Sequence, residues 1–353
     1  MDNKKKMRYL KLGILSFVVI AAVLIVAKQR NAPFQKNTGF VFGTVYNITY
    51  QSDKDLQPEI EAELKKVDNS LSTFNPKSII SKVNRNEDVV ADSMFAEVFK
   101  LAEQVSGETD GAFDITVAPL VNAWGFGFKH GKMPDNRKIN QLRKIVGFHK
   151  VSMKSGRVVK KNSATMLDCS AIAKGYGCDM VARLLASKGI KNYMVEIGGE
   201  IVVSGVNDER MPWKIGVTKP TDDSLNVNQE LQTVLNVTDK AMATSGNYRN
   251  FYYKNGKKYA HTIDPKTGRP VQHNILSATV IADNCATADA YATSFMVLGL
   301  DKAKKVLEKH TELMAYFIYS DSEGKNAVWF SPSMKGYICL LYTSPSPRDS
   351  TSS

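Results

Sequence analysis

Asp289 and Thr293 are the first residues whose types and spacing could support chemistry. They lie four positions apart in a stretch, 286–298, that we predict to be a helix, so both side chains share one helical face. A carboxylate and a hydroxyl offer hard oxygen ligands, which Mg²⁺ prefers when substrate phosphates and water complete its octahedral shell. Taken alone, such a pair is also typical of solvated or capping residues, and both interpretations stay open at this point.

His261 is the second candidate, in the segment YAHTIDP beside a predicted turn. Transfer of a phosphoryl group to a hydroxyl needs a base that accepts the proton, and histidine titrates in the range that this requires. A lone histidine is more often structural, however, and we assign that role to His130, His149, His273 and His310.

The common nucleotide and hydrolase signatures are absent from the sequence. It contains no G-x-x-x-x-G-K-[ST], G-x-S-x-G or H-E-x-x-H motif, and the glycines of 125–131 have the wrong spacing for a dinucleotide fingerprint. The chemistry of this chain must therefore come from other clusters of residues.

Small and polar residues cluster in eight segments at predicted loops and element ends. These segments are VFGTVY (41–46), LSTFNPKS (71–78), DGAFDITVAPLVNAWGFG (110–127), LDCSAIAKGYGCD (167–179), EIGGEI (196–201), ATSGNYRNF (243–251), YAHTIDPKTGRPV (259–271) and ATADAYATSFMVLG (286–299). In this order they resemble the motifs of the ApbE family, the FAD:protein FMN transferases. The resemblance extends from Gly39 to Ser331, and eight motifs in the family's order are far more specific than any one of them.

The resemblance implies an extracytoplasmic, Mg²⁺-dependent enzyme. Such an enzyme cleaves FAD at its pyrophosphate, transfers FMN through a phosphoester bond to a Ser or Thr of a target protein, and releases AMP. The usual targets are membrane redox subunits of sodium-pumping and related electron-transfer complexes, of the Nqr and Rnf type. Two alternatives stay open: an FAD pyrophosphatase that yields FMN and AMP, and a non-catalytic FAD carrier.

The resemblance also assigns roles to individual residues. The metal positions match Asp289, Thr293 and Ala171, of which Ala171 could offer only its backbone carbonyl oxygen, and the proposed catalytic histidine matches His261. Contacts to FAD are expected at Phe42, Phe74, Asp168, Lys174 and Ile263.

The segment Ala112-Phe113-Asp114 is the best candidate for flavin contact on physical grounds. Its small residue lets the backbone approach a ring, Phe113 can pack against that ring, and the Asp114 carboxylate can accept a hydrogen bond. For the aromatic residues, Phe74 included, packing in the core is the alternative. The segment 198–200 (Gly-Gly-Glu) either presents backbone amides to a phosphate or forms a bulge in a strand.

The elements that would position these residues follow an α+β pattern. Strands are predicted at 39–50, 193–204, 213–218, 276–282 and 313–319, and helices at 55–71, from about 170, and at 286–298. Since neither an internal repeat nor a linker divides the chain, we expect one compact catalytic domain, 35–340, with a mixed sheet and packed helices. The family resemblance implies a T-fold-like architecture for it.

A membrane segment is predicted ahead of that domain, within residues 1–34. The run 12–27 has Ser16 as its only polar side chain and would span about 24 Å as a helix. Five basic residues precede the run and two follow it, which places the catalytic domain on the extracytoplasmic, periplasmic side of the cell membrane. Because neither an A-x-A site nor a cysteine follows, an uncleaved signal anchor is favoured over a signal peptide.

The composition is that of a globular protein, with 43% hydrophobic and 23% charged residues. Half of the net charge of +12 lies in residues 1–30, so no basic stripe argues for a nucleic-acid partner. The four cysteines have no C-x-x-C spacing, which argues against a structural zinc site or a disulfide framework. Residues 341–353 are rich in Ser, Thr and Pro, and we interpret this segment as a disordered, non-native tail.

Overall fold

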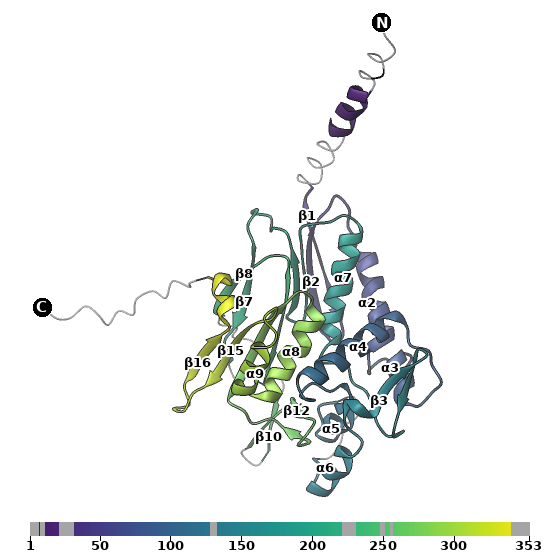
Figure 1. The fold of residues 1–353 in the computed structure, drawn as a ribbon, viewed down its shortest axis with the longest axis vertical. Coiled ribbons are helices and arrows are strands. Elements are labelled where there is room, and N and C mark those ends of the chain that lie inside the picture. The colour runs from purple at the N-terminus through teal and green to yellow at the C-terminus, as the bar shows by residue number, and fades with distance from the viewer. Residues whose placement is uncertain are drawn as a thin grey trace, which may run out of the picture.

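The computed structural model describes residues 7, 11–20, 32–127, 133–220, 231–247, 251–254 and 257–339 (Figure 1). Its centre is an eight-stranded sheet in the order β1-β2-β5-β6-β9-β14-β15-β16, and each neighbouring pair is antiparallel. The strands are β1 Phe34–Val41, β2 Thr44–Gln51, β5 Tyr193–Ile197, β6 Glu200–Ser204, β9 Lys240–Gly246, β14 Ile275–Ala282, β15 Met314–Ser320 and β16 Asn326–Phe330.

Helices cover one face of this sheet. Helix α8 packs on β9 and β14, α7 packs on β5, β6 and α8, and α2 packs on α7, as Figure 1 shows. The helices are α2 Gln57–Leu71, α3 Ile79–Asn84, α4 Ser93–Glu108, α5 Ala118–Ala123, α6 Asn136–Arg143, α7 Ala173–Ser187, α8 Cys285–Leu298 and α9 Leu300–Leu307. Short 3₁₀ turns lie at Ile115–Val117, Phe148–Lys150 and Pro332–Tyr337.

A second, three-stranded sheet supports the other face. It consists of β17 Ile338–Cys339, β8 Leu231–Val237 and β7 Trp213–Thr218 in that order. Alternation along β15 explains the two layers, because Ala315 and Phe317 join the helix-side core whereas Tyr316 and Ile318 join the core beneath the small sheet. Three hairpins complete the fold: β3 Val151–Lys154 with β4 Arg157–Lys160, β10 Phe251–Lys254 with β11 Lys257–Ala260, and β12 Ile263–Asp264 with β13 Arg269–Pro270.

The α+β fold class is confirmed, and the predicted ranges of α2, α8, β7, β14 and β15 agree with the structure to within about two residues. The expectation of a mixed sheet was wrong, because every strand pair in the described part of the chain is antiparallel. The stretches 39–50 and 193–204 are also not single strands but hairpins. Their turns, at 42–43 and 198–199, have positive φ values of 52° and 76°, and of 62° and 99°. Two successive positive φ values suit the twist of a two-residue hairpin.

The predicted membrane segment, 12–27, lies partly outside the described residues. Residues 11–20 form a helix, and 21–31 are not described. A search of the described residues finds no helix that is both long and apolar enough to cross a bilayer. The predicted tail, 341–353, lies wholly outside the described residues.

A carboxylate from α7 holds the first turn of α8. Asp179 accepts hydrogen bonds from the amides of Cys285 (2.7 Å) and Ala286 (2.9 Å), and the Asn284 side chain caps the amide of Thr287 (2.9 Å). Amides in the first turn of a helix have no intrahelical partner, and a negative charge there is favourable. Burial raises the pKa of Asp179 to about 6, although both hydrogen bonds oppose this rise. These hydrogen bonds from Cys285 and Ala286 to Asp179, called the Asp179 clamp below, therefore fix where α8 begins relative to α7.

The substitution Asp179→Ala tests the clamp. Loss of the acceptor for two buried amides should lower the free energy of unfolding at pH 5 by about 2 kcal/mol, measured by urea denaturation. Because the folded pKa of about 6 exceeds the ordinary pKa of an aspartate, about 3.9, the stability that Asp179 contributes is full below about pH 4 and decreases as the pH rises through 6. The difference from wild type should therefore be smaller at pH 8.

The matched control is Asp283→Ala, since Asp283 is 74% exposed and pairs only with Lys240 among the contacts described. This change should alter the free energy of unfolding by less than about 0.5 kcal/mol at either pH. An Asp179→Ala variant as stable as wild type at pH 5, or one that loses more at pH 8, would contradict the clamp.

Candidate active site

A cavity of about 980 Å³ opens where the start of α7 meets α8, the β1–β2 turn and the β12–β13 hairpin. This volume is at the upper end of the range for small-molecule sites. Eleven of the twelve residues predicted for the site line it: Phe42, Phe74, Phe113, Asp114, Asp168, Ala171, Lys174, His261, Ile263, Asp289 and Thr293. Motifs that are far apart in the sequence therefore meet at one place.

Ala112 is the one predicted site residue that does not line the cavity. It is 5% exposed and packs with Val271 and Val297 in a small apolar cluster. Its side chain is therefore not at the cavity, and the approach of its backbone to a flavin ring stays a prediction. Its neighbours in the motif turn toward the cavity, whereas Ala112 turns into the protein.

Asp289 reaches the cavity because α7 and α8 pack very closely. The amide of Gly175 donates to Asp289 Oδ2 at 3.2 Å. A Cβ atom at Gly175 would collide with the carbonyl oxygen of Cys285 and lie 2.9 Å from Cβ of Asp289. Only glycine permits this approach. Thr293, one turn further along α8, lines the same cavity, so the predicted shared face of the two residues is confirmed.

The oxygen donors of Asp289, Thr293 and Ala171 fit a hard cation better than a transition metal. All three residues line one cavity and offer a carboxylate, a hydroxyl and a backbone carbonyl. Across the described residues, no group of three His, Cys, Asp or Glu side chains is arranged to hold a metal. Few protein ligands, all of them oxygen, are typical of Mg²⁺ sites in which phosphates and water supply the rest.

A buried carboxylate, Glu200, forms an ion pair with the partly exposed Lys174 beside Asp289. Lys174 Nζ lies 2.5 Å from Glu200 Oε1, and the Glu200 side chain is only 4% exposed. Burial raises the pKa of the Glu200 carboxyl group and that of the Asp289 carboxyl group. Burial alone would lower the pKa of Lys174, but Glu200 and Asp289 outweigh it and raise this pKa. Two carboxyl groups thus lie near one ammonium group, and their full ionisation would leave a net negative charge that a further cation would neutralise.

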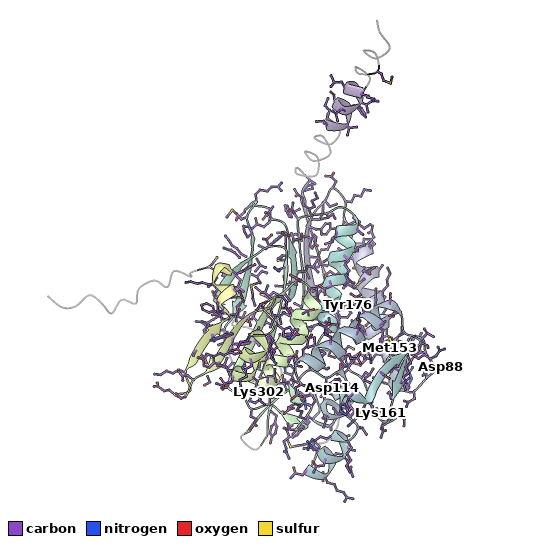
Figure 2. The ribbon with its side chains drawn as sticks, in the orientation of Figure 1. Asp88, Asp114, Met153, Lys161, Tyr176 and Lys302 are labelled. Atoms are coloured by element: carbon purple, nitrogen blue, oxygen red, sulfur yellow. The ribbon has the colours of Figure 1, made fainter. Side chains whose placement is uncertain are left out.

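Asp114, labelled in Figure 2, organises the segment predicted to contact flavin, and it lies between α4 and α5 along the chain. Its Oδ1 accepts from the amide and the hydroxyl of Thr116 (2.8 and 2.6 Å), and its Oδ2 accepts from the amide of Phe148 (2.8 Å). Burial raises the pKa of Asp114. The predicted acceptor is therefore already bonded within the protein, where it joins two loops at the cavity wall.

The aromatic residues of the cavity differ in their surroundings. Phe113 is 2% exposed and belongs to the core, whereas Phe74 is 72% exposed at the cavity rim. The core-packing alternative is therefore wrong for Phe74. Phe42 lies at the β1–β2 turn against Gly177, where a Cβ atom would come within 2.7 Å of its ring.

His261 lies between β11 and β12, on a segment that α5 helps to anchor. The indole of Trp124, just after α5, donates to the carbonyl oxygen of Gly268 (2.8 Å) and stacks on Tyr259 (5.7 Å between ring centres). Ile263 packs in the same apolar cluster as Trp124. Both sides of His261 are thereby tied to α5. The histidines at 149, 273 and 310 do not line the cavity, and 130 lies outside the described residues.

Glu200 is the functional candidate that sequence reasoning missed. The Gly-Gly segment before it is a hairpin turn and not a bulge, and its two amides donate to Val45 O and Glu196 Oε1 (both 3.0 Å). The interpretation as a phosphate nest is thus also unsupported. The available signal was a carboxylate at the first position of a strand, directly after a turn.

Comparison with known proteins agrees with this geometry. A sequence model described as "ApbE family" matches residues 42–317. The chain belongs to the ApbE family. The predicted resemblance is thereby confirmed.

Two relatives and one solved structure show how far the likeness to other ApbE proteins extends. An FAD:protein FMN transferase of Vibrio cholerae serotype O1 is 36% identical over 91% of this chain and 98% of its own. An FAD:protein FMN transferase of Haemophilus influenzae is 37% identical over 90% of this chain and 95% of its own. The structure titled flavin transferase ApbE from Vibrio cholerae has a TM-score of 0.79 at 36% identity, covering 87% of this chain and 99% of that one.

The substitution Gly175→Ala tests the close contact of α7 and α8 in this ApbE protein. The added methyl group must push the helices apart, which should lower the free energy of unfolding by about 2 kcal/mol in a urea titration. Gly107→Ala is the matched control, because Gly107 also lies in a helix but has nothing within 4 Å of its Cβ position. That change should stabilise the protein by about 0.5 kcal/mol through helix propensity. Equal effects of the two substitutions would contradict the role of the contact.

Proposed function

We propose that this chain transfers FMN from FAD to a Thr or Ser hydroxyl of a partner protein, with release of AMP and in the presence of Mg²⁺. The observation that carries the proposal is the meeting of His261, Lys174 and Asp289 in one cavity of nucleotide size. The names of the relatives support it, since the Vibrio cholerae and Haemophilus influenzae proteins are both FAD:protein FMN transferases.

Mg²⁺ would be held by the Asp289 carboxylate, the Thr293 hydroxyl and the Ala171 carbonyl. When bound there, it would neutralise charge that develops on the diphosphate oxygens during cleavage. Lys174 supplies a second positive charge to the same oxygens. The exposed ring of Phe74 and the side chains of Phe42, Phe113, Asp114, Asp168 and Ile263 hold the flavin nucleotide along the cavity.

The transfer itself needs one proton movement. The acceptor hydroxyl oxygen forms a bond to the phosphorus of the FMN half, and the bond from that phosphorus to the bridging oxygen breaks. The AMP half leaves with the bridging oxygen and its electron pair. His261 accepts the proton of the hydroxyl, which is the role that general base catalysis requires.

The proposal extends to the location of the enzyme. A run of sixteen residues, 12–27, with a single polar side chain supports a membrane anchor, and its flanking basic residues favour a catalytic domain outside the cytoplasm. Acceptors would then be membrane redox subunits of the Nqr and Rnf type.

The decisive experiment combines the purified full chain in detergent with FAD, Mg²⁺ and an acceptor domain of such a subunit. Intact-mass spectrometry of the acceptor and chromatography of the nucleotides are the readouts. An FMN adduct with an equal amount of AMP is the expected result. AMP with free FMN and no adduct on any acceptor tried would overturn transfer in favour of a pyrophosphatase. Bound, unchanged FAD would indicate a carrier.

The substitution His261→Ala tests the base. The variant should bind FAD normally, and adduct formation should be slower by about 10²-fold or more, which is typical for loss of a general base. His310→Ala is the control, because His310 bonds to Glu312 away from the cavity and should leave the rate unchanged. Transfer at the wild-type rate from saturating FAD in the His261 variant would contradict the assignment of His261 as the general base.

A further inference from the structure

Glu200 carries a buried oxygen for which the described residues supply no hydrogen-bond partner. Its residue is 3% exposed, and its Oε1 is occupied by Lys174 Nζ at 2.5 Å. Among the described residues, Glu200 Oε2 and Ser277 Oγ are the buried side-chain polar atoms that have no hydrogen-bond partner. Ser277 does not line the cavity, whereas Glu200 does.

An unsatisfied carboxylate oxygen is unfavourable for folding. A buried acceptor without a donor is destabilising by about 1–3 kcal/mol, and more when the group is charged. The ion pair with Lys174 accounts for Oε1 but leaves Oε2 without a partner among the described residues. Glu200 lines the same cavity as Asp289, and the two carboxyl groups interact electrostatically. A ligand that donates hydrogen bonds or carries positive charge is the natural partner.

We propose that Glu200 is a positioning residue for the cation and for Lys174, a proposal that rests on the function proposed above. Its Oε1 holds the Lys174 ammonium group at the cavity. Its Oε2 accepts from the water shell of a cation bound at Asp289. Mg²⁺ keeps several waters in protein sites, and carboxylates that hold such waters set the affinity of the metal.

This arrangement predicts opposite effects of Glu200 on nucleotide binding with and without metal. In the absence of a cation, the Glu200 charge repels the FAD diphosphate. In the presence of Mg²⁺, the same charge would strengthen binding of the cation near Asp289, and the cation would offset the repulsion of the diphosphate. A residue with a merely structural role would change both affinities in the same direction.

The test is Glu200→Gln, which keeps the size and the oxygen that faces Lys174 but removes the charge. FAD binding is titrated by fluorescence in EDTA and again in saturating Mg²⁺, with purified full chain. In the wild type, Mg²⁺ should tighten FAD binding. In the variant, binding in EDTA should become tighter, and the Mg²⁺ concentration that gives half of the enhancement should rise about tenfold. The measurement reports binding of FAD and does not depend on transfer activity.

Two further variants serve as controls for this measurement. Glu63→Gln, on α2, changes an 8% exposed carboxylate that pairs with Lys66 away from the cavity, and it should leave both titrations unchanged. Glu200→Asp keeps the charge and should retain Mg²⁺ enhancement if the Gln variant unfolds. Parallel losses in EDTA and Mg²⁺, or no change in either, would overturn the role of Glu200. Failure of the wild type to bind FAD would instead overturn the proposed function.

Discussion

The contact between α7 and α8 is the constraint on which the rest of the site depends. Gly175 lets the two helices approach until its amide bonds Asp289, and Asp179 holds the first turn of α8 from the opposite end of the contact. Lys174 and Asp289 are neighbours for this reason alone. The two backbones lie so close at Gly175 that the methyl group of an alanine there would collide with α8.

The sheet determines what faces that contact. Hairpin turns of β1–β2 and β5–β6 end beside α7, where they present Phe42 and Glu200 to the cavity. Residues 113–117 and the β12–β13 hairpin form the remaining wall and are linked through α5 and Trp124. A rigid helix pair therefore supplies the charges, and loops on a twisted sheet supply the walls. Such a division suits an enzyme that positions a long nucleotide against two fixed charges.

Much of this arrangement could be predicted from sequence, for identifiable reasons. Helical periodicity located α2, Gly299 marked the end of α8, and ordered motifs brought eleven of twelve candidates to one cavity. The hairpin turns were missed because alternation of apolar residues continues across a two-residue turn. Ala112 was misplaced because tertiary packing decides which way a loop residue faces. Glu200 was missed because an acidic residue after a turn is typical of a solvated surface, and only its meeting with Lys174 makes it part of the site.

The most direct measurement is a crystal structure of the protein with FAD and Mn²⁺ in place of Mg²⁺, located by anomalous scattering. The account predicts one metal peak about 2 Å from the oxygens of Asp289 and Thr293 and from the Ala171 carbonyl, with the FAD diphosphate against Lys174. Glu200 Oε2 should lie within hydrogen-bond distance of a water on that metal. A peak outside the cavity, or FAD bound with its diphosphate away from Lys174, would contradict it.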